Sequence, residues 1–402
     1  MHSTTANDAP LKGVKVIEMG ALIAGPYAAS VLAQFGAEVI KIETPGDGDP
    51  LRNWRKLHDG TSLWWYVQSR NKKSITLNLK SPAAQEIVRE LVKDADIVIE
   101  NFRPGTLEGW GLGWEQLSAI NPALVMVRVS GYGQTGPYHK RPGFAAIAES
   151  MGGLRNLVGY PDRPPVRMGV SIGDTLASLY GVIGALLAMH HVKVNRGSGQ
   201  FIDVALYEAV FGVMESLLPE YAEFGELRER TGSSLPGISP SNTYPCRDGR
   251  YVIIAGNGDS IFKRLMHAIG RADLAEDPRM ARNEGRVAHN ALIDGAIAGW
   301  TSANELDHVL AVLEAADVPS SRVYDAKDIY EDPHYRARGM IERHTLPDGA
   351  PIDVPGVVPK LSATPGKTEW LGPRLGEHTD EVLSKLGFDA ERIAALRRDG
   401  VV

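Results

Sequence analysis

The sequence predicts an α/β protein with a mostly parallel sheet that carries helices on both faces. Two observations support this fold class. Strand-like and helix-like segments alternate through the first 135 residues, and this order is typical of β-α-β units. The predicted helices also carry start and stop signals, such as proline in the first turn and glycine just past the last turn. Together these patterns favour a doubly covered sheet over an all-α or all-β chain.

The first half of the chain supplies most of the predicted sheet. Apolar, β-branched segments predict strands at residues 14–19, 37–43, 74–79, 96–100, 124–130 and 200–206. Between them, Gly25-Pro26 opens a helix that Gly36 closes, and Ser81-Pro82 caps a helix that runs to residue 93. Longer helices are predicted over residues 174–194 and 207–224.

The second half reads as a smaller unit followed by a tail. Residues 228–240 are rich in Gly, Ser and Pro and indicate a crossing between domains. A strand at 249–255 and helices near 260–270, 290–300 and 304–316 follow, and residues 346–373 are expected to be extended. The tail, 376–396, is predicted to be helical. The predicted parts are a large domain at 1–227, a small domain at 228–330 and a return segment at 331–402.

Composition excludes several classes of protein. The 402 residues are 43% hydrophobic and 23% charged with a net charge of −6, which is an ordinary globular profile that gives no support for nucleic-acid binding. The single cysteine, Cys246, excludes an intrachain disulfide and a CxxC metal site, so we expect a cytoplasmic protein. The polar segment 1–10 does not resemble a signal peptide. The apolar stretch 179–192 falls short of the roughly 20 residues of a membrane span, which predicts a buried helix and no membrane partner.

Asp174 is the most informative residue, because it lies between a glycine-bordered turn and a long apolar helix. One interpretation is a helix N-cap, in which the carboxylate accepts a hydrogen bond from the first turn. The other is a nucleophile, because the helix dipole favours the ionised form and a carboxylate can attack a thioester. Local sequence favours the cap, although the two roles do not exclude each other.

Three other motifs carry weaker functional interpretations. Gly131-Tyr-Gly-Gln-Thr-Gly136 matches a dinucleotide fingerprint, but prolines rather than a helix follow it. Gly169-Val-Ser-Ile-Gly173 matches a nucleophile elbow around Ser171, but the segment before it is a poor strand. His190 and His191 are adjacent on a helix and therefore face different sides, so no metal site is predicted.

Basic residues are expected near strand ends, where open α/β sheets bind ligands. They are Arg70, Lys72, Lys73, Lys80, Arg103, Lys140 and Arg141. Phe102 could stack on an adenine, and Arg103 could bind a phosphate with two hydrogen bonds. The placement therefore favours an anionic, nucleotide-like ligand over simple surface charge. Gly256-Asn257-Gly258 is either a plain turn or a flexible lip over a reacting centre.

Taken together, these segments resemble the class III CoA-transferases, the formyl-CoA transferase and carnitine CoA-transferase type, over nearly the whole chain. The resemblance rests on Ala24-Gly-Pro26, Gly36-Ala-Glu-Val-Ile-Lys-Ile-Glu43, Arg70-Asn-Lys-Lys-Ser74, Glu100-Asn-Phe102, Gly131-Tyr-Gly-Gln-Thr-Gly-Pro137 and Gly173-Asp174. It implies a Rossmann-like large domain that binds CoA and is completed by the return segment, together with a small α+β domain. It also implies a ring-shaped chain in an interlocked homodimer.

The resemblance further implies that Asp174 is the nucleophile. Asp174 would attack an acyl-CoA to give a mixed anhydride and CoA thiolate, and the thiolate would return to form an aspartyl-CoA thioester. The acceptor carboxylate would then leave as a new CoA thioester. CoA and acyl-CoA would be substrates, with no permanently bound cofactor. The positions that would contact CoA are Ala24, Leu77, Asn78, Lys80, Asn101, Phe102, Arg103, Arg141 and Phe144. Gly256-Asn257-Gly258 looks like the glycine loop that closes over the site.

Departures from the pattern narrow the substrates. Ile23 is apolar where formyl-CoA transferases often have a polar residue. Thr44 and Gly109–Trp110 occupy positions where the family has arginines that contact CoA. We therefore do not expect formyl-CoA and oxalate to be the donor and acceptor. The similar α-methylacyl-CoA racemases use a His in a Gly-His-Asp segment as one of two proton relays. The matching segment here is Gly143-Phe-Ala145, which has no His, and this argues against a racemase. Within the family, the sequence most resembles the succinate–hydroxymethylglutarate CoA-transferases, which use dicarboxylates. A racemase, a hydrolase or a silent acyl-CoA-binding protein remain the alternatives.

Overall fold

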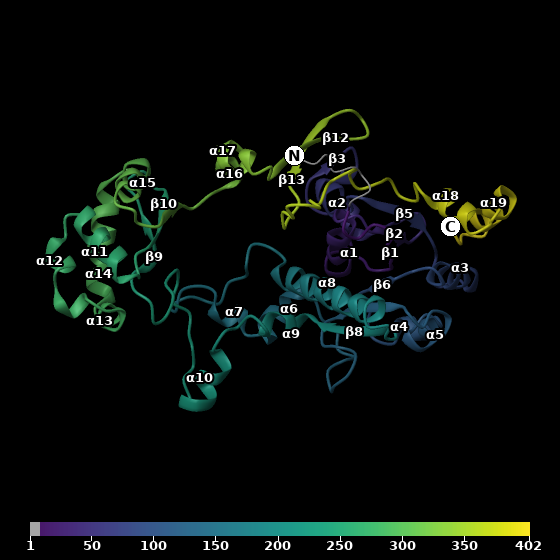
Figure 1. The fold of residues 1–402 in the computed structure, drawn as a ribbon, viewed down its shortest axis with the longest axis horizontal. Coiled ribbons are helices and arrows are strands. Elements are labelled where there is room, and N and C mark those ends of the chain that lie inside the picture. The colour runs from purple at the N-terminus through teal and green to yellow at the C-terminus, as the bar shows by residue number, and fades with distance from the viewer. Residues whose placement is uncertain (1–8) are drawn as a thin grey trace. The chain divides into compact units, whose positions relative to one another are not determined.

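The computed structural model describes residues 9–402, so most of the polar segment 1–10 lies outside the described residues. The chain forms two compact units (Figure 1). The first contains residues 9–155, 167–226 and 336–402, and the second contains 156–166 and 227–335. Residues 156–166, which the sequence-based division puts in the large domain, belong to the second unit. The C-terminal part returns to the first unit, where His378 N donates to Ser74 O.

A six-stranded sheet forms the centre of the first unit, and all its strand pairs are parallel. This confirms the predicted α/β class with a parallel sheet. The strand order is β5-β2-β1-β6-β7-β8. Their bounds are β1 (Lys15–Glu18), β2 (Glu38–Glu43), β5 (Lys72–Thr76), β6 (Ile97–Glu100), β7 (Val125–Ser130) and β8 (Gln200–Ala205).

Helices cover both faces of this sheet, because alternate strand residues are apolar on both sides. On one face, Val16, Ile97 and Val127 share a core with α1 (Ala24–Gln34), α6 (Ala145–Met151), α8 (Ile172–Lys193) and α9 (Leu206–Phe211). On the other face, Ile17 and Val98 pack with α3 (Pro82–Val92), α5 (Trp114–Ile120), α18 (Thr379–Lys385) and α19 (Ala390–Arg398). Strands apolar on both faces are expected only where both faces are buried.

Shorter elements complete the first unit. They are η1 (Pro50–Asn53), β3 (Leu57–His58), β4 (Thr61–Ser62), α2 (Leu63–Gln68), α4 (Thr106–Gly109), α10 (Leu217–Phe224), β12 (Ile341–Thr345) and β13 (Pro351–Pro355). The strands β12 and β13 form an antiparallel hairpin. The short helices α7 (Leu154–Leu157) and α17 (Pro333–Ala337) cross the boundaries between the units.

The second unit has an antiparallel sheet in the order β11-β10-β9, packed against helices around its own apolar core. Its strands are β9 (Ser241–Pro245), β10 (Tyr251–Ala255) and β11 (Ser320–Arg322). Its helical elements are α11 (Asp259–Ala268), α12 (Ala272–Ala275), η2 (Pro278–Met280), α13 (Asn283–Ala288), α14 (Asn290–Ala303), α15 (Leu306–Ala315) and α16 (Ala326–Glu331).

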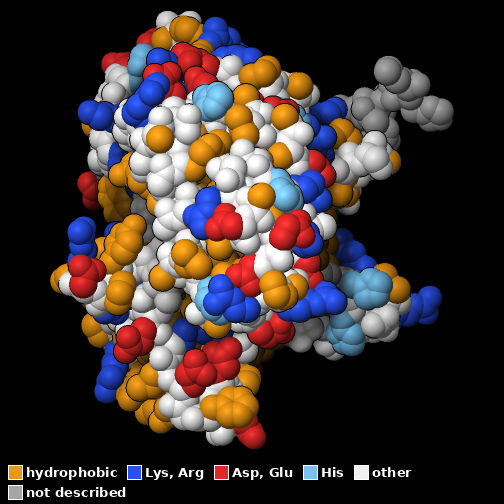
Figure 2. All heavy atoms as spheres, turned by 90° about the vertical axis from the view of Figure 1, so that its left-hand side faces the viewer, with side chains coloured by type: hydrophobic (Ala, Val, Ile, Leu, Met, Phe, Trp, Pro, Cys, Tyr) orange, Lys and Arg blue, Asp and Glu red, His pale blue; other side chains and the backbone are white. Residues whose placement is uncertain are grey.

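Basic, acidic and hydrophobic side chains are interspersed over the face shown in Figure 2. This mixture agrees with the modest net charge of −6. This face lacks the one-sided basic charge of a surface that binds nucleic acid.

Two predicted helices differ from the structure. The helix predicted at 207–224 is interrupted between α9 and α10, where Glu215 has a φ of 53° that a helix does not accommodate. The tail consists of two helices that are separated at Gly387, whose φ is 86°. In both cases a left-handed residue overrides the apolar pattern. The segment 346–373 is extended where it contributes β13 to a hairpin, although the hairpin itself was not predicted.

The prediction for the long helix also needs correction. Helix α8 spans 22 residues, so its length and composition alone would suffice for a membrane span. It is only partly buried, with 44% of its most apolar 18-residue window inside the structure. Leu187 is 67% exposed and Ile183 is 53% exposed, so the helix is not the fully buried element that the sequence suggested.

The strand order also determines where a ligand can bind. From β1 the chain proceeds to β2 and β5 on one side, whereas β6, β7 and β8 extend the sheet on the other side. The loops after β1 and β6 therefore diverge at the carboxyl edge of the sheet and leave a crevice between them. Such a switch point is the usual ligand site of an open α/β sheet.

Candidate active site

A cavity of about 560 Å³ lies at this switch point. Its walls come from the loop after β1 (Ala21–Ala24), the loop after β6 (Asn101–Pro104), the segments 129–131 and 141–146, and the start of α8. Asp174 lines it together with Arg167 and Ser171. The fold therefore brings a carboxylate to the edge of the sheet where ligands bind.

Asp174 is the third residue of α8, so the N-cap interpretation is wrong. The helix begins at Ile172, and Ser171 occupies the N-cap position without a side-chain capping bond. The pKa of Asp174 is raised to about 6, because burial and the charge of Glu149 raise it while the charge of Arg167 lowers it. A carboxyl with this pKa is mostly ionised at pH 7 but keeps an unusually high basicity. High basicity favours nucleophilic attack.

Glu149, on α6, is the charge that opposes ionisation of Asp174. It is 1% exposed and forms an ion pair with Arg155 at 2.9 Å. Its Oε1 atom is buried and has no hydrogen-bond partner among residues 9–402. A buried carboxylate with only one oxygen satisfied is costly, and such strain is typically kept where it serves function.

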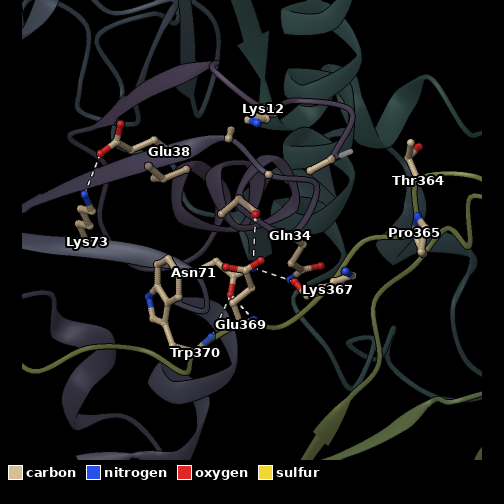
Figure 3. A pocket seen from close by; sticks show the side chains of 15 residues that line it. Lys12, Gln34, Glu38, Asn71, Lys73, Thr364, Pro365, Lys367, Glu369 and Trp370 are labelled. Atoms are coloured by element: carbon tan, nitrogen blue, oxygen red, sulfur yellow. Dashed lines mark hydrogen bonds and ion pairs between the residues drawn. The ribbon is translucent and has the colours of Figure 1, made fainter. Parts of the chain in front are cut away.

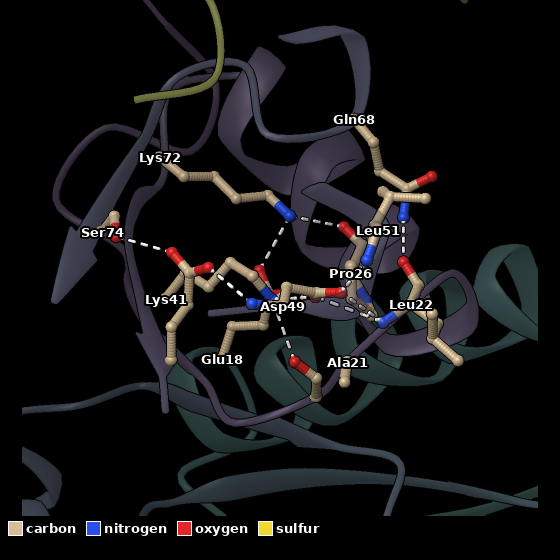
Figure 4. Close-up of polar contacts among 12 residues, drawn as sticks. Glu18, Ala21, Leu22, Pro26, Lys41, Asp49, Leu51, Gln68, Lys72 and Ser74 are labelled. Atoms are coloured by element: carbon tan, nitrogen blue, oxygen red, sulfur yellow. Dashed lines mark hydrogen bonds and ion pairs between the residues drawn. The ribbon is translucent and has the colours of Figure 1, made fainter. Parts of the chain in front are cut away.

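A buried network of ion pairs lies under the loop after β1 (Figure 4). Lys41 Nζ contacts Glu18 Oε1 at 2.7 Å and Asp49 Oδ2 at 2.8 Å, and Lys72 Nζ contacts Glu18 Oε2 at 2.8 Å. These four side chains are at most 3% exposed. Buried charges that compensate one another in this way hold the surrounding backbone in one arrangement.

The same network fixes the loop that lines the cavity. Lys41 Nζ donates to Gly20 O at 2.9 Å, and Lys72 Nζ donates to Pro26 O at 2.7 Å. Leu22 N donates to the Asp49 carboxylate at 3.1 Å, which holds Leu22 at a φ of 66°. Such a left-handed conformation is unfavourable for leucine without these partners.

Ser178 joins this loop to the helix that carries Asp174. Its buried hydroxyl contacts both Ala24 O and Asp174 O at 2.7 Å. Asn101 holds the other end of the loop, because Ala21 N donates to its Oδ1 and its Nδ2 donates to Ala21 O, both at 2.8 Å. The amide of Asn101 is therefore used to position the loop.

The predicted CoA-contact residues fall into two groups. Six of them line the cavity: Ala24, Asn101, Phe102, Arg103, Arg141 and Phe144. Phe102 is half-buried and packs edge-on against Trp110, with 5.4 Å between ring centroids. Leu77, Asn78 and Lys80 do not line the cavity. Leu77 is in the core, Asn78 N donates to Val401 O at 2.8 Å, and Lys80 is exposed.

The expected basic cluster is only partly present. Arg103 and Arg141 line the cavity, and the guanidinium of Arg141 stacks over the Tyr138 ring at 3.7 Å. Lys72 and Lys73 instead begin β5, at the opposite edge of the sheet, and form internal ion pairs. Arg70 Nη1 donates to Pro355 O at 2.6 Å. The strand starts earlier than predicted, which moves these three residues to its amino end.

The glycine loop 256–258 lies in the second unit, between β10 and α11. It is not a hairpin turn, because Gly258 directly precedes the helix. Gly256 N donates to Pro240 O at 2.9 Å, and Asn257 O accepts from the buried Arg286 at 2.6 Å. The loop is therefore attached to its own unit at both ends.

The competing motifs lack the structure that their chemistry needs. No helix opens after Gly131–Gly136, since the next helix begins at Ala145. These glycines instead allow close packing, because a Cβ on Gly131 would come within 2.9 Å of the Gly143 Cα. No strand occurs in the residues before Ser171, as a nucleophile elbow requires. Within residues 9–402, no group of three or more metal-ligating side chains occurs.

A second cavity, of about 310 Å³, lies at the amino ends of β2 and β5 (Figure 3). Its polar side chains serve the fold. Lys73 pairs with Glu38 at 2.8 Å, and Asn71 donates to Lys367 O and accepts from Glu369 N, both at 2.7 Å. The two hydrogen bonds of Asn71 attach the return segment to the large domain. Of the basic residues predicted near strand ends only Lys73 lines this cavity, and none of the predicted nucleophile, CoA-contact or glycine-loop residues does.

Sequence reasoning missed two charged residues at the candidate site. Arg167 is seven positions before Asp174 and could have been found by asking which cations flank the nucleophile. Glu149 gave no such signal, because a glutamate in a helical segment usually faces solvent. Only packing of α6 against α8, where a Cβ on Gly173 would lie 3.3 Å from Ala145 O, shows that α6 belongs to the site.

Comparison with known proteins agrees with this architecture. The chain is 49% identical over 395 residues to the succinyl-CoA–D-citramalate CoA-transferase of Chloroflexus aurantiacus, covering 98% of each chain. It is 36% identical to the succinate–glutarate CoA-transferase of Agrobacterium fabrum, covering 94% of this chain and 96% of that protein. A crystal structure of a CAIB/BAIF family protein from Brucella suis aligns with a TM-score of 0.84 at 35% identity, over 94% of this chain and all of that chain. The family model for CoA-transferase family III matches residues 11–379. The chain therefore belongs to CoA-transferase family III.

Proposed function

We propose that this enzyme transfers CoA from succinyl-CoA to a dicarboxylic acid, with Asp174 as the covalent nucleophile. The observation that carries the proposal is the position of Asp174 in the cavity at the switch point, where burial raises its pKa to about 6. The substrate assignment is supported by relatives named for succinyl-CoA and D-citramalate and for succinate and glutarate.

The proposed reaction conserves the thioester bond energy in covalent form. The Asp174 carboxylate attacks the thioester carbonyl and expels CoA thiolate, which leaves a mixed anhydride. The thiolate attacks the Asp174 carbonyl and releases the donor acid, which leaves an aspartyl-CoA thioester. The acceptor carboxylate attacks this carbonyl and again expels thiolate. The thiolate then attacks the acceptor acyl carbonyl, which forms the new CoA thioester and regenerates the Asp174 carboxylate.

The chain's own residues would support each step. The first turn of α8 has no side-chain cap, so its N–H groups and helix dipole can stabilise negative charge that develops on the reacting oxygens. Arg103 and Arg141 would pair with CoA phosphates, and Phe102 offers a ring face for stacking. Gly256–Gly258 would form the loop that excludes water, which would hydrolyse the anhydride. By resemblance, the active form would be a homodimer.

Trapping with hydroxylamine tests the proposal. Incubation with succinyl-CoA and hydroxylamine should modify Asp174 to a hydroxamate that peptide mass spectrometry can locate. Asp174→Ala should abolish both the modification and CoA transfer, while Ser171→Ala retains both. An adduct on Ser171 would indicate a hydrolase instead. Loss of substrate chirality without CoA exchange would indicate a racemase, and binding without turnover would indicate a silent binding protein.

A further inference from the structure

The charges that line the cavity are unbalanced. Among its lining side chains, three are arginines and one is a carboxylate: Arg103, Arg141, Arg167 and Asp174. A site that gathers three cations against one anion is suited to a polyanionic ligand. The three arginines do not occupy equivalent positions, and their differences indicate which anion each one binds.

Arg103 and Arg141 lie in the loops that follow β6 and β7. Arg103 comes directly after Phe102, the ring offered for stacking, and Arg141 is stacked on Tyr138. Both therefore lie next to aromatic rings rather than next to the nucleophile. This arrangement fits a ligand with phosphates beside an aromatic base.

Arg167 differs, because it enters the cavity from the segment that leads into α8. Its charge acts on the Asp174 carboxyl and lowers the pKa of that group. The side chain is exposed, and its guanidinium has no hydrogen-bond or ion-pair partner within residues 9–402. Arg167 is thus a free cation close to the reacting carboxylate.

We propose that Arg167 binds the distal carboxylate of the dicarboxylic acyl group whose other carboxyl reacts at Asp174. The proposal rests on the proposed function and adds to it the residue that selects dicarboxylic over monocarboxylic substrates. Because donor and acceptor react in turn at the same atom, one arginine serves both of them.

Charge compensation is the physical reason for this selection. A succinyl group brings a second negative charge into a cavity where Asp174 is already partly desolvated. An uncompensated carboxylate would be disfavoured there, whereas a planar guanidinium can bind it with two parallel hydrogen bonds. A neutral acyl chain of equal length forms no ion pair with this arginine. The enzyme would therefore distinguish the two acyl groups only by the charge of the distal group.

The test compares two donors of equal chain length, succinyl-CoA and butyryl-CoA. The readout is the initial rate of CoA thiol release in the presence of hydroxylamine, taken before modification of Asp174 inactivates the enzyme and corrected for the Asp174→Ala background, so no acceptor acid is needed. For Arg167→Gln, the ratio of kcat/KM for succinyl-CoA to that for butyryl-CoA should fall about 10- to 100-fold, the range for one charged hydrogen-bond pair. Arg167→Lys should restore part of this ratio, because it keeps the charge but not the planar fork.

Arg103→Gln is the matched control, since it removes another cavity arginine that we assign to CoA. It should raise KM for both donors by the same factor and leave the ratio unchanged. Circular dichroism of each variant verifies that it is folded. An Arg167→Gln enzyme that loses both donors equally, or neither, would overturn the inference while CoA transfer itself stands. A wild-type enzyme that releases no CoA from either donor would overturn the proposed function and this inference together.

Discussion

At the scale of single residues, the proposed chemistry depends on how the charges of Glu149 and Arg167 act on the carboxyl group of Asp174. Burial disfavours the ionised form of Asp174, Glu149 disfavours it further, and Arg167 partly restores it. The resulting pKa of about 6 leaves an ionised nucleophile at neutral pH that stays more basic than an exposed aspartate.

This balance predicts the pH dependence of the reaction. Because the ionised form of Asp174 attacks, kcat/KM should fall as pH drops through about 6, the pKa of this carboxyl. Glu149→Gln removes a negative charge that raises this pKa, so the acid limb should move to lower pH. The measurement is kcat/KM for succinyl-CoA at a series of pH values on both sides of about 6.

Glu220→Gln on α10 serves as the control, because the causes of the Asp174 shift do not include Glu220. It should leave the midpoint where the wild type has it. A midpoint that stays fixed in Glu149→Gln, or that moves to higher pH, would show that Glu149 does not influence the nucleophile.

At the scale of elements, the loop after β1 is held by charges rather than by apolar packing. Lys41 compensates both Glu18 and Asp49, and Asp49 in turn holds Leu22 N. Removing Lys41 would leave Asp49 without a counter-charge and Glu18 with Lys72 alone, and an unpaired buried charge is far more costly than replacement of the whole group.

We therefore expect Lys41→Met to lower the free energy of unfolding by about 3–5 kcal/mol, because Glu18 and Asp49 lose their shared cation. Urea denaturation monitored by circular dichroism measures the loss. Lys385→Met is the matched control, because that lysine pairs with Glu381 while 62% exposed, and its loss should cost at most about 0.5 kcal/mol. Equal losses in the two variants would refute a stabilising role for the buried network.

The sequence predicted elements best where the local pattern and the tertiary environment agree. The strands β1, β2, β6 and β7 follow from apolar runs that the structure buries on both faces, and the edge strand β8 follows from a run that is buried only at its end. The β12–β13 hairpin was missed, because prolines at 351 and 355 argue against a strand unless it lies at an edge. Phe102 and Arg103 were placed near the carboxyl edge by strand order alone, whereas Asp174 was singled out only by the glycine-bordered turn that precedes a long apolar helix. Lys72 was misplaced, because sequence does not reveal its buried ion pair with Glu18.

At the scale of the whole molecule, helix α8 exposes a row of large apolar side chains. Leu179, Ile183, Leu186 and Leu187 are between 41% and 67% exposed. Spacings of three and four residues place them along one side of the helix. Contiguous exposed apolar surface usually marks an interaction site. We assign this side of α8 to the proposed homodimer.

Leu187→Lys should therefore weaken self-association, because a charge would replace the most exposed of these side chains. Light scattering coupled to size-exclusion chromatography should show mass moving from two chains toward one as the variant is diluted. Leu292→Lys, at a leucine of the second unit that is 46% exposed, controls for added charge and should keep the wild-type mass. An unchanged mass for Leu187→Lys at every concentration would remove α8 from the interface.

The contact between Gly131 and Gly143 limits how this enzyme can be redesigned. Both glycines line the cavity, and even a methyl group on Gly131 would collide with the backbone of Gly143. Directed evolution toward new acids cannot reshape the wall at these two sites without moving the main chain. Accepted changes should instead accumulate at side chains such as Phe144, which is 69% exposed and has room to vary.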